Sequence, residues 1–292
     1  MQNKIIDGNI QSQSLRKQIQ AQIYDLKIKP KLDIILIGNN PASEVYVNIK
    51  QKRASEVGIE TELHILNDSI SNDFLLHFIQ SLNENSSVHG ILVQMPLPKH
   101  INKSDVLSTI SYEKDVDGFS PINVGRLYTQ NPYFIPCTPL GIMHLIKSVK
   151  PNLSGMKATV IGRSNIVGRP IAELLLQENC TVKIVHSQTK NIQNECNESD
   201  ILVAAVGIPN FVTKEFVKPG AIVIDVGISK INSKIVGDVH FENVIHKVSY
   251  ITPVPGGVGP MTVAYLLHNT LKASNECLSN MKSFTPYTKT TM

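Results

Sequence analysis

The sequence lacks tryptophan and has few aromatic residues of any kind. Only 5% of its 292 residues are Phe, Trp or Tyr. Stacking platforms for nucleic-acid bases are built from such side chains, so we expect no nucleic-acid partner. There is also no long run of basic residues, and the formal net charge of +4 is mild. A small anionic ligand would account for that charge as well as nucleic acid would.

Metal-binding, redox and membrane motifs are absent as well. The four cysteines, Cys137, Cys180, Cys196 and Cys277, include no C-x-x-C pair, and no histidine lies near them at the spacing of metal ligands. We therefore expect reduced thiols and no metal site. No apolar segment is long enough to cross a bilayer, and the first residues, 1–7, carry no targeting pattern. These features predict a cytoplasmic protein with no membrane partner.

Short apolar runs alternate with amphipathic segments along the whole chain, which is typical of an α/β protein. The apolar runs predict strands at 33–37, 60–66, 90–94, 158–161, 182–185, 201–205 and 221–225. The segments around them predict helices at 12–26, 42–57, 72–82, 136–149, 170–177, 192–198 and 261–273. At this length the chain exceeds one average domain, and we place the domain change near Pro136–Pro139.

A glycine turn in the second half predicts a nucleotide site. The predicted strand at 158–161 leads into Gly162-Arg-Ser-Asn-Ile-Val-Gly168, which leads into a helix. In dinucleotide-binding proteins the backbone N–H groups of such a turn bind a pyrophosphate. The spacing departs from G-x-G-x-x-G, so the turn alone is a weak signal. The next strand ends at 185–189 without the acid that selects NAD, and Arg163, Ser187 and His186 are candidates for the extra phosphate of NADP.

Ser43, Tyr46 and Lys50 share one face of a predicted helix, because they lie three and four residues apart. A lysine whose pKa is lowered by its surroundings can transfer a proton or polarise a substrate atom. The alternative is that Lys50 is an ordinary exposed lysine above a half-buried Tyr46. A Tyr-x-x-x-Lys pattern taken alone more often indicates such a surface pair than a site. Short-chain dehydrogenases also carry Tyr-x-x-x-Lys, but after their nucleotide-binding turn, whereas here it precedes the turn by a whole domain.

Two polar residues lie where ligands often bind. Gln94 ends the third predicted strand, at the edge where open α/β sheets bind ligands. Asp117 lies before a glycine in Lys114-Asp-Val-Asp-Gly118, a pattern that is equally typical of a structural turn. Either residue alone is more often part of a turn than of a site.

The stretch Pro253-Val-Pro-Gly-Gly-Val-Gly-Pro-Met-Thr262 packs three prolines and three glycines into ten residues. Prolines fix φ, whereas glycines let a ligand approach the backbone closely. Pro260 suits the first turn of the helix that follows. A tight surface connection is the alternative interpretation.

Taken together, these motifs resemble the bifunctional methylenetetrahydrofolate dehydrogenase/methenyltetrahydrofolate cyclohydrolase family (the bacterial FolD family). The resemblance covers nearly the whole chain, from Ile5 to about Leu271. The segments that carry it occur in the family's order, and they are 40–46 with Lys50, 90–98, 114–119, 136–139, 162–170 and 253–262. One departure is Ser120, where many bacterial members carry histidine.

The resemblance implies a role for each matching residue. The catalytic residues are Lys50, Gln94 and Tyr46. Lys50 is the catalytic lysine, Gln94 assists it in activating water and stabilising the developing intermediate, and Tyr46 packs on or positions the folate. Asp117 bonds the pterin, and the loop residues Pro255, Gly256 and Gly257 line the substrate site. The cofactor NADP is carried by Gly162, Arg163, Ser164, Ser187 and Ile228.

The implied activity is NADP-dependent oxidation of 5,10-methylenetetrahydrofolate to the 5,10-methenyl form, followed by hydrolysis to 10-formyltetrahydrofolate. The resemblance also implies a polyglutamylated folate as substrate and a homodimer. One competing interpretation is an NADP oxidoreductase of the shikimate-dehydrogenase type. Another is a non-catalytic nucleotide-binding protein.

These inferences predict two three-layer α/β domains with a cleft between them. Residues 1–138 and the C-terminal helical segment 261–292 are expected to form a folate-binding, catalytic domain. Residues 139–260 are expected to form a Rossmann-type NADP-binding domain. The Pro/Gly loop would then be the return crossing and a wall of the cleft.

Overall fold

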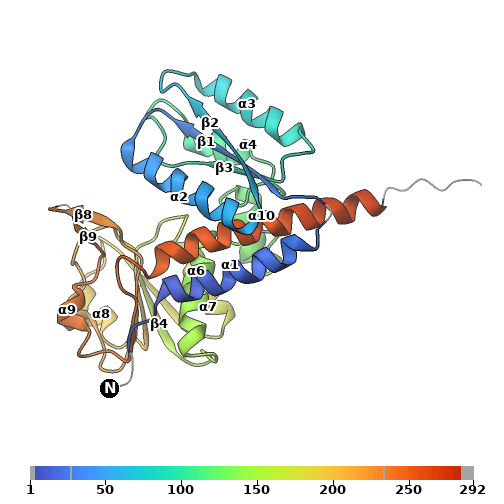
Figure 1. Cartoon of the computed structure of the whole chain (residues 1–292). Coiled ribbons are helices and arrows are strands. Elements are labelled where there is room, and N and C mark those ends of the chain that lie inside the picture. The colour runs from blue at the N-terminus through green and yellow to red at the C-terminus, as the bar shows by residue number, and fades with distance from the viewer. Residues whose placement is uncertain (1–3, 27, 233, 284–292) are drawn as a thin grey trace, which may run out of the picture. The chain divides into compact units, whose positions relative to one another are not determined.

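The protein forms two compact units, each built on a parallel sheet (Figure 1). The computed structural model describes residues 4–26, 28–232 and 234–283. The five-stranded unit comprises Met1–Leu15 and Asp117–Leu266, and the three-stranded unit comprises Arg16–Val116 and Leu267–Met292. The unit boundaries fall inside helices α1 (Gly8–Tyr24) and α10 (Val258–Ser283). The predicted α/β class is confirmed, while the predicted domain limits stay a prediction, and their last residues, 284–292, lie outside the described residues.

The three-stranded unit has the strand order β2-β1-β3, with every pair parallel. Its elements are β1 (Lys31–Ile37), α2 (Pro41–Val57), β2 (Glu60–Leu66), α3 (Asn72–Glu84), β3 (Gly90–Val93) and α4 (Lys103–Thr109). Parallel neighbours need crossover connections, which the helices supply. In Figure 1, α2 covers one face of this sheet, and α3 and α4 cover the other. Because β1 is covered on both faces, its sequence is almost continuously apolar.

The core under α3 explains why that helix forms. Ser71 caps its start by accepting the N–H of Phe74, and the buried residues Leu75, Ile79 and Leu82 recur at helical spacing. These side chains pack on apolar side chains of β1, β3, α4 and the residue that ends α4, which are Ile35, Ile37, Ile91, Val93, Val106 and Ile110. The apolar face of the helix and that of the sheet therefore bury each other.

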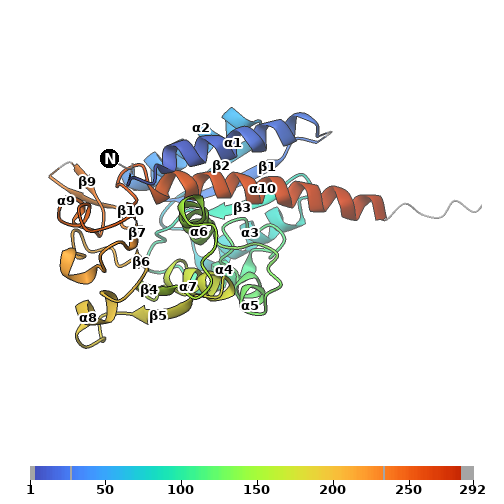
Figure 2. The same cartoon turned by 90° about the horizontal axis from the view of Figure 1, so that it is seen from below.

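The five-stranded unit has the strand order β10-β7-β6-β4-β5, again all parallel, and Figure 2 shows this order across the sheet. Its strands are β4 (Lys157–Ile161), β5 (Thr181–Val185), β6 (Ile201–Ala204), β7 (Ile222–Asp225) and β10 (Tyr250–Ile251). From β4 the chain first goes to β5 on one side and then returns to β6 on the other. That reversal is the topological switch point at which open α/β sheets bind ligands.

Helices cover both faces of this second sheet (Figure 1). One face carries α6 (Cys137–Val149) and α7 (Gly168–Gln177). The other carries α8 (Ile192–Cys196), the 3-10 helix η1 (Lys214–Phe216) and α9 (Phe241–Val244), over a core that includes Val185, Leu202 and Val223. The remaining elements are α5 (Pro121–Tyr128) and the antiparallel hairpin of β8 (Ser229–Ile231) and β9 (Lys234–Val236).

Some predicted limits differ from the observed ones. Helix α1 begins at Gly8 rather than at residue 12, because Asp7 Oδ1 accepts the N–H groups of Asn9 and Ile10 and so caps an earlier turn. Helix α10 runs on to Ser283 rather than 273, since no glycine or proline interrupts that stretch. Pro260 lies in its first turn, as predicted. None of the helices in the described part of the chain has both the length and the apolar character needed to cross a membrane.

Truncation of the α3 core should destabilise the protein. Ile79 is 0% exposed, and Ile79→Ala is expected to lower the free energy of unfolding by about 2–5 kcal/mol, because it removes buried methyl groups and leaves a cavity. Phe74 on the same helix is 52% exposed, so Phe74→Ala is expected to cost about 0.5 kcal/mol or less. Urea unfolding followed by circular dichroism measures both, and equal losses would contradict this account of the core.

Candidate active site

A lysine and a glutamine of the three-stranded unit are joined by a hydrogen bond. Lys50 lies on α2 and Gln94 directly follows β3, 44 residues later. The Lys50 Nζ donates to Gln94 Oε1 over 2.9 Å. The Gln94 amide is itself fixed, because its Nε2 donates to the carbonyl oxygen of Met95 over 2.6 Å and its backbone N–H donates to Ile35. The structure therefore brings together two of the three residues predicted to be catalytic, and the third, Tyr46, lies on the same helix as Lys50.

The helix that carries Lys50 also exposes apolar side chains next to it. Val45, Tyr46 and Ile49 are between 41% and 58% exposed, which is unusual for three large apolar residues within two turns. Pro41 begins the helix, and the Asn40 side chain accepts the N–H of Ser43. Ser43 itself is buried, so the polar face predicted from its spacing reduces to Tyr46 and Lys50. An exposed aromatic ring beside a lysine suits a flat, partly charged ligand.

The glycine turn of the five-stranded unit has the tight geometry of a phosphate-binding loop. Gly162 has φ +117°, and a Cβ on it would lie 2.3 Å from the carbonyl oxygen of Ala205. A Cβ on Gly168 would lie 2.3 Å from the carbonyl oxygen of Gly162. Ser164 Oγ accepts the N–H groups of Val167 and Gly168, at 3.2 and 3.3 Å, at the start of α7. The bare backbone at the head of a helix fits a pyrophosphate group.

The other predicted cofactor residues lie at the same edge of this sheet. Arg163 follows β4, Ser187 follows β5 and Ile228 follows β7, and all three are exposed. Ligands of open parallel sheets bind at the carboxyl ends of the strands. All three thus lie at the edge where a dinucleotide is expected, and their contact with the cofactor stays a prediction.

The predicted substrate residues of the five-stranded unit have structural roles of their own. Asp117 is half-buried and precedes Gly118, whose φ is +74°. In the Pro/Gly loop, the carbonyl oxygen of Gly256 accepts the N–H of Gly8 over 2.8 Å at the start of α1. A Cβ on Gly257 would lie 2.5 Å from the carbonyl oxygen of Pro253. These glycines are needed for packing, and their contact with substrate stays a prediction, as it does for Pro255.

Ser120, the departure from the family pattern, has a local explanation. It is the N-cap of α5, and its hydroxyl oxygen accepts the N–H of Asn123 over 3.3 Å. Serine is among the preferred residues at this position.

Sequence reasoning missed two buried acids, Asp225 and Asp238, in the five-stranded unit. Asp225 accepts the N–H groups of Gly227, Asp238 and Val239. Burial raises the pKa of Asp225 to about 6, and the charge of Asp238 adds to the rise. Burial also raises the pKa of Asp238. The signal in the sequence was an acid at the end of an apolar strand, Ile222–Asp225, where a charge has no ordinary place.

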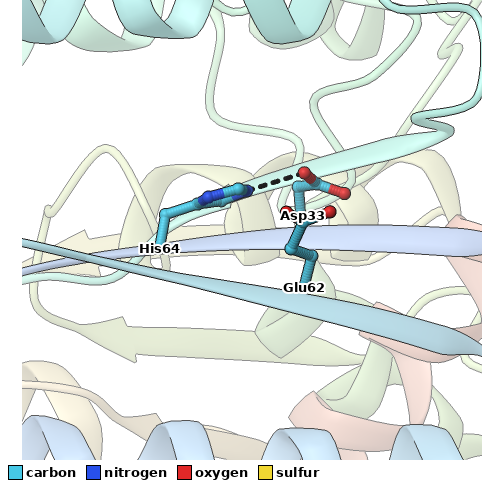
Figure 3. Close-up of side chains that lie close together, drawn as sticks. All are labelled: Asp33, Glu62 and His64. Atoms are coloured by element: carbon cyan, nitrogen blue, oxygen red, sulfur yellow. Dashed lines mark hydrogen bonds and ion pairs between the residues drawn. The ribbon is translucent and has the colours of Figure 1, made fainter.

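A separate cluster of two acids and a histidine lies on β1 and β2 of the three-stranded unit (Figure 3). The ligand atoms of Asp33, Glu62 and His64 lie within 4.8 Å of one another, and His64 Nε2 is 2.7 Å from Asp33 Oδ2. Two carboxylates and an imidazole are ligands that a divalent transition metal accepts. However, the Lys31 Nζ lies 2.6 Å from Glu62 Oε2 and 3.7 Å from Asp33 Oδ1. The ammonium group of Lys31 therefore already supplies a positive charge to these two carboxylates.

Comparison with known proteins identifies the family to which both halves of the chain belong. Residues 6–117 match the model of the tetrahydrofolate dehydrogenase/cyclohydrolase catalytic domain. Residues 136–278 match the model of the NAD(P)-binding domain of the same family. The chain belongs to the tetrahydrofolate dehydrogenase/cyclohydrolase family. The resemblance noted in the sequence is confirmed.

Individual members of the family are similar over almost their full length. The bifunctional protein FolD of Wolbachia pipientis (strain wPip) is 56% identical, over 92% of this chain and 95% of its own. That of Listeria innocua is 50% identical, over 93% and 97%. The crystal structure of the Campylobacter jejuni enzyme, 47% identical, superposes with a TM-score of 0.91 over 93% of this chain and 99% of its own.

A Trypanosoma brucei family member solved with NADP and an inhibitor is 38% identical, with a TM-score of 0.90 over 94% of this chain and 98% of its own. Shikimate dehydrogenase from Aquifex aeolicus, the type considered as a competitor, is 11% identical with a TM-score of 0.51. That likeness shows a shared fold alone. The competing interpretation is therefore not favoured.

The turn at Gly162 allows a direct test of the nucleotide site. Gly162→Ala is expected to weaken dinucleotide binding by about tenfold or more, because the added Cβ would meet the carbonyl oxygen of Ala205 and displace the loop. Gly155→Ala is the matched control, since Gly155 also has a positive φ but open space around its Cβ position. Both variants place a Cβ at a positive φ, +117° at Gly162 and +79° at Gly155, which costs about 1–3 kcal/mol in each. Titration with the reduced dinucleotide, followed by its fluorescence, should show weakening in the first variant alone.

Proposed function

We propose that the protein oxidises 5,10-methylenetetrahydrofolate with NADP and hydrolyses the resulting methenyl form to 10-formyltetrahydrofolate. The observation that carries the proposal is the hydrogen bond between Lys50 and Gln94, in a chain whose two parts match the two domains of this family. The bare glycine turn at Gly162 supports NADP as the cofactor. When bound, NADP would accept a hydride from the methylene carbon of the folate.

Lys50 is assigned the proton transfer of the hydrolytic step. Water adds to the cationic methenyl carbon and gives one proton to the Lys50 amine. The bond from that carbon to N5 then breaks, the remaining hydroxyl proton ends on N5, and the formyl group stays on N10. A lysine can take that proton only when its amine is neutral, and a neighbouring cation favours the neutral form. Gln94 Oε1 accepts from the Lys50 Nζ and so holds the amine in one direction. This fixed direction is the contribution we assign to Gln94.

The remaining site residues are assigned to binding. Tyr46 offers an exposed ring one turn from Lys50 for the folate to pack on. We assign the pterin to Asp117, and further folate contacts to Pro255, Gly256 and Gly257. We assign the cofactor to residues at the carboxyl ends of the parallel strands, namely Gly162, Arg163, Ser164, Ser187 and Ile228.

We further propose a cytoplasmic homodimer that acts on polyglutamylated folate. The net charge of +4 suits two polyanionic ligands, NADP and the polyglutamate tail. In this proposal, residues 1–138 with 261–292 serve folate binding and catalysis, and residues 139–260 serve NADP binding.

Substitution of Lys50 tests the proposed chemistry. In an assay that follows methenyl absorbance, Lys50→Met is expected to lower the cyclohydrolase rate by about a hundredfold or more, because it removes the proton acceptor. Affinity for NADP should stay unchanged. Lys52→Met, on the same helix at an exposed position, is the control for the loss of one positive charge. A Lys50→Met protein with full cyclohydrolase activity would contradict the assignment of Lys50 as the proton acceptor.

A further inference from the structure

The buried acids Asp225 and Asp238 tie together the loops at the carboxyl edge of the five-stranded sheet. Asp225 is the last residue of β7, and Asp238 follows the hairpin β8–β9. Asp238 Oδ2 accepts the N–H groups of Val206 and Gly207, at 2.7 and 3.0 Å, just after β6. Asp225 Oδ1 in turn accepts the backbone N–H of Asp238 over 2.8 Å. The pair therefore fixes the exits of β6 and β7 relative to each other.

The second oxygen of Asp238 is buried without a hydrogen bond. Across the part of the chain that the structure describes, Asp238 Oδ1 has no hydrogen-bond partner, and the residue is 0% exposed. It lies against the backbone of Gly227, where an added Cβ would be 2.1 Å away. A protonated carboxyl would have to donate its proton, yet Oδ2 faces two donors and Oδ1 faces no acceptor. The arrangement suits a carboxylate whose charge is not matched by any group at Oδ1.

The strand order places the loops that Asp238 holds on one side of the glycine turn after β4. In the Rossmann arrangement the turn after the first strand binds the pyrophosphate, and the end of the second strand meets the ribose on the adenine side. Those strands are β4 and β5, and β6 and β7 lie on the other side of β4. The loops held by Asp238 therefore belong to the nicotinamide half. The nicotinamide ring is positively charged in NADP+ and neutral in NADPH.

We propose that Asp238 is a positioning residue of the nicotinamide site whose unmatched carboxylate oxygen makes the protein bind NADP+ more tightly than it would without that charge, with little effect on NADPH. The inference rests on the NADP dependence proposed above. A charge in a poorly solvated site acts on a nearby cation more strongly than it does in water. Because NADPH carries no charge on its ring, the preference between the two forms reports this effect.

The variant Asp238→Asn removes the negative charge of the side chain but keeps its size and shape. Its amide oxygen can accept the N–H groups of Val206 and Gly207, while its NH2 group takes the place of the unmatched oxygen. The dissociation constant for NADP+ is expected to rise about three- to tenfold, and that for NADPH to change less than about twofold. NADPH fluorescence titration gives the second constant, and displacement of NADPH gives the first. Glu198→Gln, an exposed acid paired with Lys157 at the amino edge of the sheet, is the control and should change neither.

The outcomes separate the inference from the function on which it rests. Equal weakening of NADP+ and NADPH in Asp238→Asn, or no weakening of either, overturns the proposal. Asp238→Ala removes the acceptor of the N–H groups of Val206 and Gly207. It should therefore weaken the binding of both NADP+ and NADPH, which tests the role of Asp238 in positioning the loop. If the unaltered protein binds neither form, the proposed NADP dependence itself fails.

The unaltered protein gives a second readout that needs no substitution. Asp225, whose pKa lies near 6, takes up a proton as the pH falls, and the pair of acids then becomes less negative. Within the described residues, Asp238 is the charged neighbour of Asp225, and its other contacts, Gly227, Val239 and Thr252, are neutral. The preference for NADP+ over NADPH should therefore fall between about pH 7.5 and pH 5.5. The 2′-phosphate is common to both forms and cancels in the ratio, so a ratio that is constant across this range contradicts the proposal.

Discussion

In a parallel sheet all strands deliver their carboxyl ends to the same edge, and the chemistry proposed for this protein depends on that constraint in both units. In the three-stranded sheet it places Gln94, at the end of β3, within hydrogen-bonding distance of Lys50. In the five-stranded sheet it gathers the Gly162 turn, Ser187 and Ile228 at one edge. Parallel strands also require helical crossovers, so α2 and α7 each follow directly on such an edge. The same geometry thus supplies the lysine of one site and the helix N-terminus of the other.

Close backbone approach is the second requirement of the five-stranded unit. Gly162 lies so near Ala205, and Gly227 so near Asp238, that any side chain at either glycine would collide with its neighbour. Asp238 then holds the exit of β6 through two N–H groups. The loop after β6 is thus held by a buried acceptor, while its residues Gly207 and Ile208 stay exposed.

Much of this structure could be predicted from the sequence, because the signals are local. The apolar runs of β1 and β4 and the spacing of Leu75, Ile79 and Leu82 depend only on neighbouring residues, and the α/β class inferred from them is confirmed. The carboxyl-edge positions of Gln94 and Ser187 followed from the same reasoning.

What the sequence did not reveal depends on contacts between distant segments. The direct bond between Lys50 and Gln94 joins residues 44 positions apart, and the motifs alone did not specify it. Asp238 follows a short, mostly exposed hairpin that carries no strong strand pattern, so neither the hairpin nor the role of the acid was foreseen. The start of α1 was misplaced for a smaller reason of the same kind, a cap supplied by Asp7.

The central claim is that Lys50 and Gln94 act as one unit in the hydrolytic step. A double-mutant cycle on kcat/KM for hydrolysis of methenyltetrahydrofolate, with Lys50→Met, Gln94→Ala and the double variant, tests it most directly. If Gln94 acts by directing the Lys50 amine, the double variant should be within about threefold of Lys50→Met alone, because nothing remains for Gln94 to direct. Losses that multiply across the two substitutions would show that the residues act independently, and would contradict the account.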